Sequence, residues 1–319
     1  MKYHQHTFEY TDATLEEIQA RGIIPIYLNA SSLKLSACDR RYAFAVAGGL
    51  RAGGTEDPIL TMGSALHKFA ETYTRTKGDV TDAITEARRA FPAITAAELI
   101  PIVARRAEVR IPEPLYLDGQ PCVEVKFAAP WMIFTYDEIT YCFVVCGTID
   151  HLGLDNNALM IIDYKSTRYA VIEYAINKYK HETQFKFYLW ALWKFGARFL
   201  PLEIHNMLVE SRAYSQVCFI QLSGKSPRWI MDTSRRNMTP FMYAEYETEL
   251  RGKLNQLANA FLIHTHGGAN DAQGMISNGC QYCDYTTYCH APTEAARVAA
   301  NLTFTHKPYN PIEERGEPV

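Results

Sequence analysis

The sequence predicts an α/β fold in which a mixed central sheet is flanked by helices. Residues 60–76 carry apolar side chains at helical spacing, whereas residues 121–165 are rich in β-branched and aromatic residues separated by turn signals. Helical spacing returns over residues 171–195. Helical segments on both sides of a run of strands are typical of a sheet that packs against helices.

The N-terminal third of the chain is predicted to be mainly helical. Ser31-Ser-Leu has the composition of a helix start, and residues 33–44 continue it at roughly helical spacing. Residues 60–76 form the clearest amphipathic helix, with His67 beside its apolar stripe, and more helix is expected through about residue 109. The stripe consists of Met62, Leu66, Phe69 and Tyr73.

Four strand-like segments follow, separated by turn signals. They are Cys122–Phe127, Trp131–Tyr136, Tyr141–Asp150 and Ala158–Lys165. Short strands in this arrangement predict an antiparallel meander. We expect Asp155-Asn156-Asn157 to form the tight turn between the last two strands.

The C-terminal part is predicted to hold two further strands and one long helix. The strands are expected at residues 204–211 and 216–222, and the helix at residues 239–264. The chain then becomes irregular and rich in cysteine. The tail after Pro292 contains three more prolines, so we expect it to be loose.

Composition and charge exclude several classes of protein. The 319 residues are 48% hydrophobic and 21% charged, as in ordinary packed chains, and the net charge of −3 excludes a globally basic binder of nucleic acid. No apolar run reaches the ~20 residues of a membrane helix. The polar start does not resemble a signal peptide, so we expect a soluble, cytoplasmic protein. There is no GxxxxGK[ST] motif, which argues against an ATPase motor.

The segment Ala158–Lys165 places an acid and an amine on one face of a strand. Asp163 and Lys165 are two residues apart, and such residues point to the same side. The preceding strand ends at Asp150, so a hairpin would bring Asp150 beside Asp163. Two carboxylates can hold Mg²⁺ or Mn²⁺, and the lysine can assist hydrolysis of a phosphodiester. A surface Asp–Lys pair without function is the alternative interpretation.

Three of the eight cysteines are clustered near the C-terminus. Cys280, Cys283 and Cys289 can direct three sulfurs to one ion or cluster, and a closed site needs a fourth ligand. Their spacing fits zinc and an iron–sulfur cluster equally. Four other cysteines lie in strand-like segments and are interpreted as small buried hydrophobic residues: Cys122, Cys142, Cys146 and Cys218.

Several motifs together resemble the PD-(D/E)XK nuclease superfamily in its RecB-like branch. Gly147-Thr-Ile-Asp150 is followed by Ile161-Ile-Asp163-Tyr-Lys165, and His67 lies where that branch has an upstream metal-binding histidine. Gln184 and Tyr188 match its QxxxY motif. Ser31-Ser-Leu followed by Cys38 resembles the entry motif of members with an iron–sulfur cluster, such as CRISPR adaptation nucleases, AddB-type nucleases and phage-encoded exonucleases.

The resemblance covers roughly residues 31–290 and implies a restriction-endonuclease-like fold. It implies one nuclease domain over residues 1–319, with a helical N-terminal lobe, a core and a Cys-rich C-terminal region. The expected boundaries are 1–110 for the lobe, 120–222 for the core, 223–292 for the C-terminal helix and Cys-rich region, and 293–319 for the tail. Ile149 stands where the superfamily name has proline, as is common in this branch.

The resemblance also implies roles for the site residues. His67, Asp150, Asp163 and the backbone carbonyl of Tyr164 are expected to hold Mg²⁺ or Mn²⁺, with Lys165 assisting the attacking water. A core or boundary histidine is the alternative for His67.

The implied roles extend to three further side chains. Gln184 and Tyr188 are expected to contact the DNA backbone or to steady Lys165, with ordinary helix packing as the alternative for Tyr188. Glu124 is either an acid near the metals, as in relatives, or a solvated strand residue.

Cys38 is implied as the fourth ligand of the cysteine cluster. With Cys280, Cys283 and Cys289 it would hold a 4Fe–4S cluster, and zinc is the alternative. Cys38 and Cys280 are 242 positions apart. Closing such a loop stabilises a fold by on the order of 5 kcal/mol, so we expect a mainly structural role.

The implied function is that of a metal-dependent DNA exonuclease. It would act on single strands or DNA ends in recombination, repair or phage DNA processing. The expected partners are a helicase or a single-strand annealing protein, and the expected location is the inside of a cell, including a phage-infected host cell. A non-catalytic DNA-end-binding or adaptor module is the alternative, but such a module should lack one of the acids or the lysine. An iron–sulfur carrier is a third hypothesis, and it leaves Asp150, Asp163, Lys165 and Gln184 unexplained. The oligomeric state is open.

Basic and aromatic residues near the predicted site suit a single strand of DNA. The alternative is that most of these side chains are ordinary solvated or packed residues. The basic residues are Arg40, Arg41, Arg51, Arg168, Lys178, Lys180, Lys186, Arg235 and Arg236. The aromatic residues are Tyr164, Tyr169, Tyr174, Tyr179 and Phe187.

Overall fold

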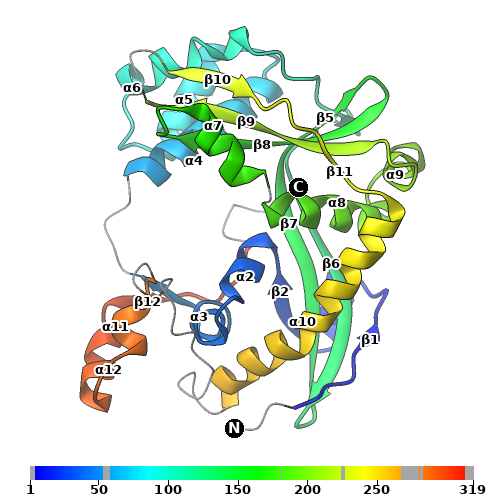
Figure 1. Cartoon of the computed structure of the whole chain (residues 1–319), viewed down its shortest axis with the longest axis vertical. Coiled ribbons are helices and arrows are strands. Elements are labelled where there is room, and N and C mark those ends of the chain that lie inside the picture. The colour runs from blue at the N-terminus through cyan, green and yellow to red at the C-terminus, as the bar shows by residue number, and fades with distance from the viewer. Residues whose placement is uncertain are drawn as a thin grey trace. The chain divides into compact units, whose positions relative to one another are not determined.

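The computed structural model describes residues 4–52, 58–180, 182–223, 227–266, 280 and 283–312, and these divide into two compact units. Neither unit is a continuous piece of chain. Unit 1 comprises Met1–Thr55, Phe127–Gly147 and Glu247–Val319, and unit 2 comprises Glu56–Lys126 and Thr148–Tyr246. Strands β6 (Val123–Tyr136) and β7 (Ile139–Asp155) and helix α10 (Pro240–His266) contribute to both units (Figure 1).

A mixed sheet forms the centre of unit 2. The end of β7 pairs with β8 (Ala158–Thr167) in antiparallel fashion, and β8 pairs with β9 (Ala213–Gln221) in parallel. Strands β10 (Arg228–Met231) and β11 (Arg236–Asn237) both pair with β9 in antiparallel fashion. The predicted mixed central sheet is therefore confirmed.

Helices pack on both faces of this sheet (Figure 1). On one face, α4 (Pro58–Arg75), α5 (Val80–Ala90) and α6 (Ala96–Val103) bury an apolar cluster that includes Met160, Ile162, Cys218 and Ile220. Val217 and Phe219, which alternate with these residues along β9, pack instead with α7 (Ile172–Tyr179) and α8 (Thr183–Phe195). Because strand residues alternate between faces, the two clusters identify the two sides of the sheet.

The tight turn between β7 and β8 is confirmed at Asn156 and Asn157. Their backbone φ angles are 49° and 61°, in the left-handed region that a two-residue hairpin turn requires. Asparagine tolerates this region better than most residues because its short side chain can bond to the local backbone. The same turn geometry joins β6 to β7 at Asp137 and Glu138.

Three predictions about elements were wrong. The segments 122–127 and 131–136 are one continuous strand, β6, so the three residues between them do not form a turn. Residues 204–211 are mostly helix rather than strand, because α9 (Leu202–Val209) begins after Pro201 and buries Ile204 and Leu208, which share a helical face. The predicted helix 171–195 is two helices, α7 and α8.

The tail was also predicted wrongly, since it is ordered over much of its length. Helix α12 (Glu294–Asn301) is followed by β12 (Phe304–His306), which pairs with β3 (Leu50–Ala52) near the other end of the chain. Residues 313–319 lie outside the described residues.

Unit 1 is built around the outer part of the β6–β7 hairpin. Strand β2 (Ile24–Leu28) pairs in parallel with β7, and β1 (Glu9–Tyr10) pairs with β6. Buried Cys142, Val144 and Cys146 of β7 pack with Ile18 of α1 (Leu15–Ala20). The remaining elements of this unit are α2 (Ala30–Leu35), α3 (Asp39–Tyr42), the π-helical turn η1 (Ala43–Ala47) and α11 (Thr286–Cys289).

The smaller elements of unit 2 are two short strands and two 3₁₀ turns. They are β4 (Tyr116–Leu117), β5 (Gln120–Pro121), η2 (Arg106–Glu108) and η3 (Gly196–Arg198). Among the described residues of the whole chain, no helix is both long enough and apolar enough to cross a membrane.

Candidate active site

The β7–β8 hairpin brings three predicted site residues together in unit 2. His151 of β7 lies opposite Ile162 of β8, and Asp150 and Asp163 are the next residues beyond this pair. The backbone N–H of Tyr164 donates to Asp150 Oδ2 at 2.8 Å, which fixes that carboxylate at the strand. Both carboxylates are almost fully buried. The short turn at Asn156 and Asn157 therefore sets the position of both acids.

His67, Glu124 and Asp150 form a group that could hold a metal ion. One ligand atom from each lies within 4.8 Å of the others. His67 Nδ1, from α4, is 3.4 Å from Asp150 Oδ2 and 3.9 Å from Glu124 Oε1. A nitrogen and carboxylate oxygens suit Mg²⁺ or Mn²⁺. Among the described residues, this is the one such group of His, Cys, Asp and Glu side chains.

Glu124 reaches this group through an unusual backbone. Its φ angle is 51°, in the left-handed region, although it lies inside strand β6. For a residue other than glycine this conformation costs of order 1–3 kcal/mol, and such strain is concentrated at functional sites. The sequence left the role of Glu124 open, because an acid in a strand gives no sign of a left-handed backbone.

Asp163 contacts different partners from those of Asp150. Lys165 Nζ lies 2.8 Å from Asp163 Oδ1 and 2.7 Å from Oδ2. Gln184 Nε2 of α8 donates to Asp163 Oδ1 at 2.8 Å and to the Tyr188 hydroxyl at 3.2 Å. Gln184 thus contacts Asp163 rather than Lys165, and the expected roles of Gln184 and Tyr188 stay predictions. Asp163 does not belong to the His67 group, so its role as a metal ligand stays a prediction, as does that of the Tyr164 carbonyl.

Burial and charge together shift the pKa values of these groups. Burial opposes the charged form of His67, but Asp150 and Glu124 raise its pKa to about 10. Burial would also raise the pKa of Asp150, yet His67 and Lys165 hold it well below its usual range. Burial, with Asp150 nearby, raises the pKa of Asp163. Without a metal ion, these shifts favour a histidinium at His67 beside an ionised Asp150.

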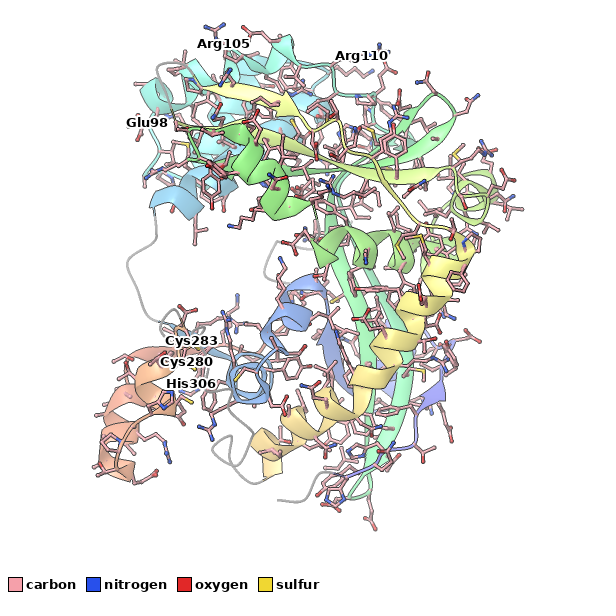
Figure 2. The ribbon with its side chains drawn as sticks, in the orientation of Figure 1. Glu98, Arg105, Arg110, Cys280, Cys283 and His306 are labelled. Atoms are coloured by element: carbon pink, nitrogen blue, oxygen red, sulfur yellow. The ribbon has the colours of Figure 1, made fainter. Side chains whose placement is uncertain are left out.

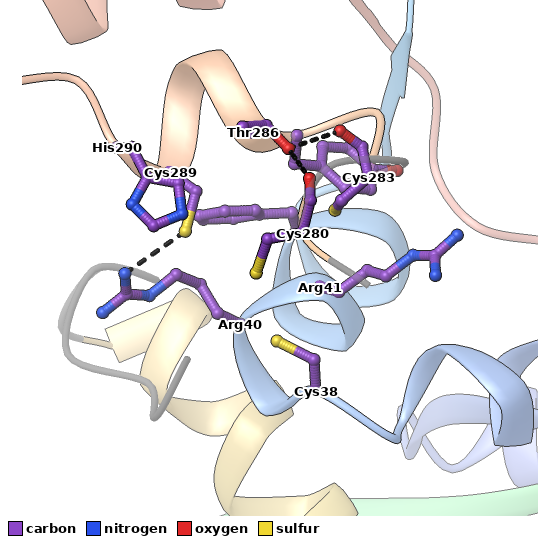
Figure 3. A pocket seen from close by; sticks show the side chains of 10 residues that line it. Cys38, Arg40, Arg41, Cys280, Cys283, Thr286, Cys289 and His290 are labelled. Atoms are coloured by element: carbon purple, nitrogen blue, oxygen red, sulfur yellow. Dashed lines mark hydrogen bonds between the residues drawn. The ribbon is translucent and has the colours of Figure 1, made fainter. Parts of the chain in front are cut away.

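A second cluster of predicted site residues lies in unit 1. Cys38, Cys280, Cys283 and Cys289 line one cavity of about 260 Å³ (Figure 3). Cys38 precedes α3, Cys289 ends α11, and Cys280 and Cys283 lie in the chain before α11. Figure 2 shows Cys280 and Cys283 in the part of unit 1 that carries α11 and α12. The structure therefore brings together cysteines that are far apart in the sequence.

Local hydrogen bonds hold the cysteine-bearing segments in place. The N–H of Cys283 donates to the Cys280 carbonyl at 3.1 Å, and Thr286 Oγ1 donates to the Cys283 carbonyl at 2.8 Å. Arg40 Nη1 donates to Cys289 Sγ at 3.2 Å (Figure 3). The contact between Arg40 and Cys289 was not anticipated from the sequence, where Arg40 was a candidate for binding DNA.

The four cysteines interpreted as packing residues are indeed buried. Each is at most 5% exposed, and burial raises the pKa of each thiol, which disfavours the thiolate that binds metals. They are Cys122, Cys142, Cys146 and Cys218.

Several predicted DNA contacts are not available on the surface. Tyr164 and Phe187 are 2% and 0% exposed, so neither can stack on a base. Arg236 is paired with the buried Asp232 at 2.6 Å. Tyr169 and Tyr174, in contrast, are 44% and 65% exposed.

Comparison with known proteins identifies the family of this chain. The family model described as the PD-(D/E)XK nuclease superfamily matches residues 28–290. A crystal structure described as "Putative exonuclease" from Eubacterium rectale is similar at 12% sequence identity and a TM-score of 0.44, covering 85% of this chain and 93% of that one. No curated protein sequence matches. Because the family model spans most of its length, the chain belongs to the PD-(D/E)XK nuclease superfamily.

Proposed function

We propose that this protein is a divalent-metal-dependent exonuclease that hydrolyses DNA. The observation that carries the proposal is the convergence of His67, Glu124 and Asp150 beside the Asp163–Lys165 pair. A buried ion pair adds little to the stability of a fold. Two buried carboxylates held close together lower that stability unless a cation compensates their charge. Asp150 and Asp163 are both buried, and Lys165 and His67 supply the compensation before metal binds.

Each residue of this group would have a different role in hydrolysis. His67, Glu124 and Asp150 would hold the metal, with Asp163 and the Tyr164 carbonyl as further ligands. A bound Mg²⁺ or Mn²⁺ polarises a phosphoryl oxygen and acidifies water. Lys165 directs its ammonium toward the attacked phosphate or the incoming water, and Gln184 steadies Asp163. Lys165 stays charged because the two nearby carboxylates outweigh the effect of burial and raise its pKa.

Two exposed tyrosines favour single strands as the substrate. Tyr169 and Tyr174 follow the strand that carries Lys165, and their ring centroids are 6.4 Å apart. Gln221 and Ser223 donate to the Tyr169 carbonyl, which fixes the backbone there. Exposed Arg168 and Lys178 add positive charge nearby. Unpaired bases can stack on such rings, whereas bases inside a duplex cannot.

The cysteine cavity fits a cluster better than a single zinc ion. Zinc–sulfur bonds of about 2.3 Å in a tetrahedron place the sulfurs roughly 3.8 Å apart. No three of the four cysteine sulfurs lie within 4.8 Å of one another, although all four belong to the described residues. A cavity of about 260 Å³ with four thiols around it is wide enough for several metal atoms. We therefore infer a 4Fe–4S cluster, and with it the RecB-like branch.

The biological setting follows from the same proposal. A chain without an ATPase motif of its own would act on strands or ends that a helicase or an annealing protein supplies, in recombination, repair or phage DNA processing.

The proposal is tested by cleavage of end-labelled DNA strands by protein purified without oxygen. We expect cleavage with Mn²⁺ or Mg²⁺, none with EDTA, and loss of cleavage in Asp150→Asn. The exposed Asp118 of unit 2 offers a matched control, Asp118→Asn, which should retain activity. Cleavage by pure Asp150→Asn at the wild-type rate would refute the assignment. Iron and sulfide content, measured on the same sample, tests the cluster independently.

A further inference from the structure

Arg106 is a buried cation next to two arginines that are exposed. It opens the short turn η2 after α6 and is 9% exposed. Arg105 and Arg110 lie on the outer surface of unit 2 (Figure 2), and Arg105 pairs there with Glu108 at 2.6 Å. Of these three neighbouring arginines, only Arg106 points into the interior of unit 2.

The surroundings of Arg106 leave its charge without a counter-ion. The guanidinium lies 5.3 Å from the centre of the Tyr73 ring and 5.6 Å from that of Trp229. Its Nη1 donates to the Val109 carbonyl at 3.2 Å. In the part of the chain that the structure describes, no carboxylate lies within ion-pair distance of it. Two aromatic rings, one carbonyl and the neutral Tyr164 hydroxyl offset only part of the cost of burying a charge.

Arg106 lines a cavity that a small ligand could enter. The cavity measures about 560 Å³, within the range of ligand sites. Lys77 contributes a second cation to its wall, the imidazole of His151 is 1% exposed, and Glu113 is an exposed acid. None of the residues that line it belongs to the group of His67, Glu124 and Asp150. The cavity is thus a second site within unit 2.

We propose that this cavity binds a phosphate group, with Arg106 as its buried counter-charge and Lys77 as a second ligand. The planar guanidinium is suited to the oxygens of phosphate, and an anion there supplies the charge that the fold lacks. The preference for phosphate over a carboxylate rests on the proposed nuclease function. The group could belong to a free mononucleotide or to the phosphorylated end of a strand.

Thermal unfolding of the full chain in EDTA tests the proposal, because EDTA prevents cleavage and metal–phosphate contacts. Inorganic phosphate and deoxyadenosine monophosphate should raise Tm at constant ionic strength, and deoxyadenosine should not. Lys77→Ala should weaken the affinity for the monophosphate about tenfold. Arg106→Lys should weaken it as well, whereas Arg110→Ala, which removes an exposed arginine outside the cavity, should leave it unchanged.

Two results would overturn the proposal. One is a wild-type Tm that responds to phosphate no more than to chloride. The other is an unchanged affinity in Lys77→Ala, a variant that removes only an exposed side chain. Oligonucleotides with and without a 5′- or 3′-phosphate distinguish the sources: tighter binding of a phosphorylated end than of the mononucleotide assigns the strand, and equal or weaker binding assigns the free nucleotide. Metal-dependent cleavage without phosphate binding would leave the nuclease proposal intact.

Discussion

At the residue scale, Lys165 offers the most direct test of mechanism. Its ammonium lies 2.7 Å from Asp163 Oδ2, at the edge of the group of His67, Glu124 and Asp150. We expect Lys165→Ala to lower kcat by roughly 10²–10⁴-fold, the usual effect of removing a group that moves a proton or stabilises charge. Single-turnover cleavage measures this effect. The matched variant Lys253→Ala, which removes a surface lysine of α10, should cleave normally. A kcat for Lys165→Ala close to that of wild type would contradict the role.

The raised pKa of His67 predicts that the stability of the metal-free protein depends on pH. Its folded pKa of about 10 lies above its ordinary value of 6.5. The stability that it contributes is therefore fully present below pH 6.5 and is lost as the pH rises through about 10. Urea unfolding in EDTA at pH 6, 8 and 10.5 should show this loss in wild type and a smaller one in His67→Gln. Equal losses in the two proteins would disprove the pairing.

The sequence predicts most of the site because local rules govern most of it. Asp163 and Lys165 share a face by strand alternation, and the turn at Asn156 and Asn157 brings Asp150 beside them. The role of Glu124 could not be predicted, because a left-handed φ in a strand depends on tertiary contacts. The pairing of Arg40 with Cys289 joins residues 249 positions apart, and nothing local indicates it.

At the element scale, the β7–β8 hairpin positions both acids. Asn157 has a φ of 61°, so Asn157→Val forces a β-branched residue into the left-handed region. We expect a loss of roughly 1–2 kcal/mol in the free energy of unfolding, by urea titration. Asn157→Gly should be nearly neutral, since glycine adopts this conformation readily. If Asn157→Val were as stable as wild type, the turn would not constrain the hairpin.

The elements that were predicted wrongly are either short or continue through a residue that commonly ends such an element. Helix α9 has eight residues, too few for periodicity to separate a helix from a buried strand. Strand β6 continues through Pro130, because a proline need not end a strand where no ladder hydrogen bond is required of it. Long elements such as α4 were predicted well, since several turns of apolar stripe reinforce one another.

At the scale of the whole molecule, the four-cysteine cavity links distant parts of unit 1. A filled cavity closes a loop from Cys38 to Cys280, which by loop-closure entropy stabilises the fold by on the order of 5 kcal/mol. Cys289→Ser should therefore lower the iron content and reduce the free energy of unfolding by several kcal/mol, as measured by anaerobic urea titration. Cys122→Ala, in a buried cysteine of unit 2, should keep the iron and cost only about 1 kcal/mol. Full iron content in Cys289→Ser would exclude that residue as a ligand.

The division into units was beyond local sequence reasoning. Helices α4 to α6 belong with the sheet of unit 2, whereas the residues before them belong with the C-terminal part of the chain. This assignment rests on pairings such as β3 with β12, which connect residues more than 250 positions apart. Hydrophobic periodicity identifies elements, but it does not identify partners at such separations.

The interleaved chain has a consequence for biosynthesis. Every segment of unit 2 has been translated once the ribosome has passed residue 246, so unit 2 can assemble on the nascent polypeptide. Strand β12 and three of the four cysteines that line the cavity are translated only after unit 2. The first 52 residues can therefore pair with these segments only after unit 2 has been synthesised.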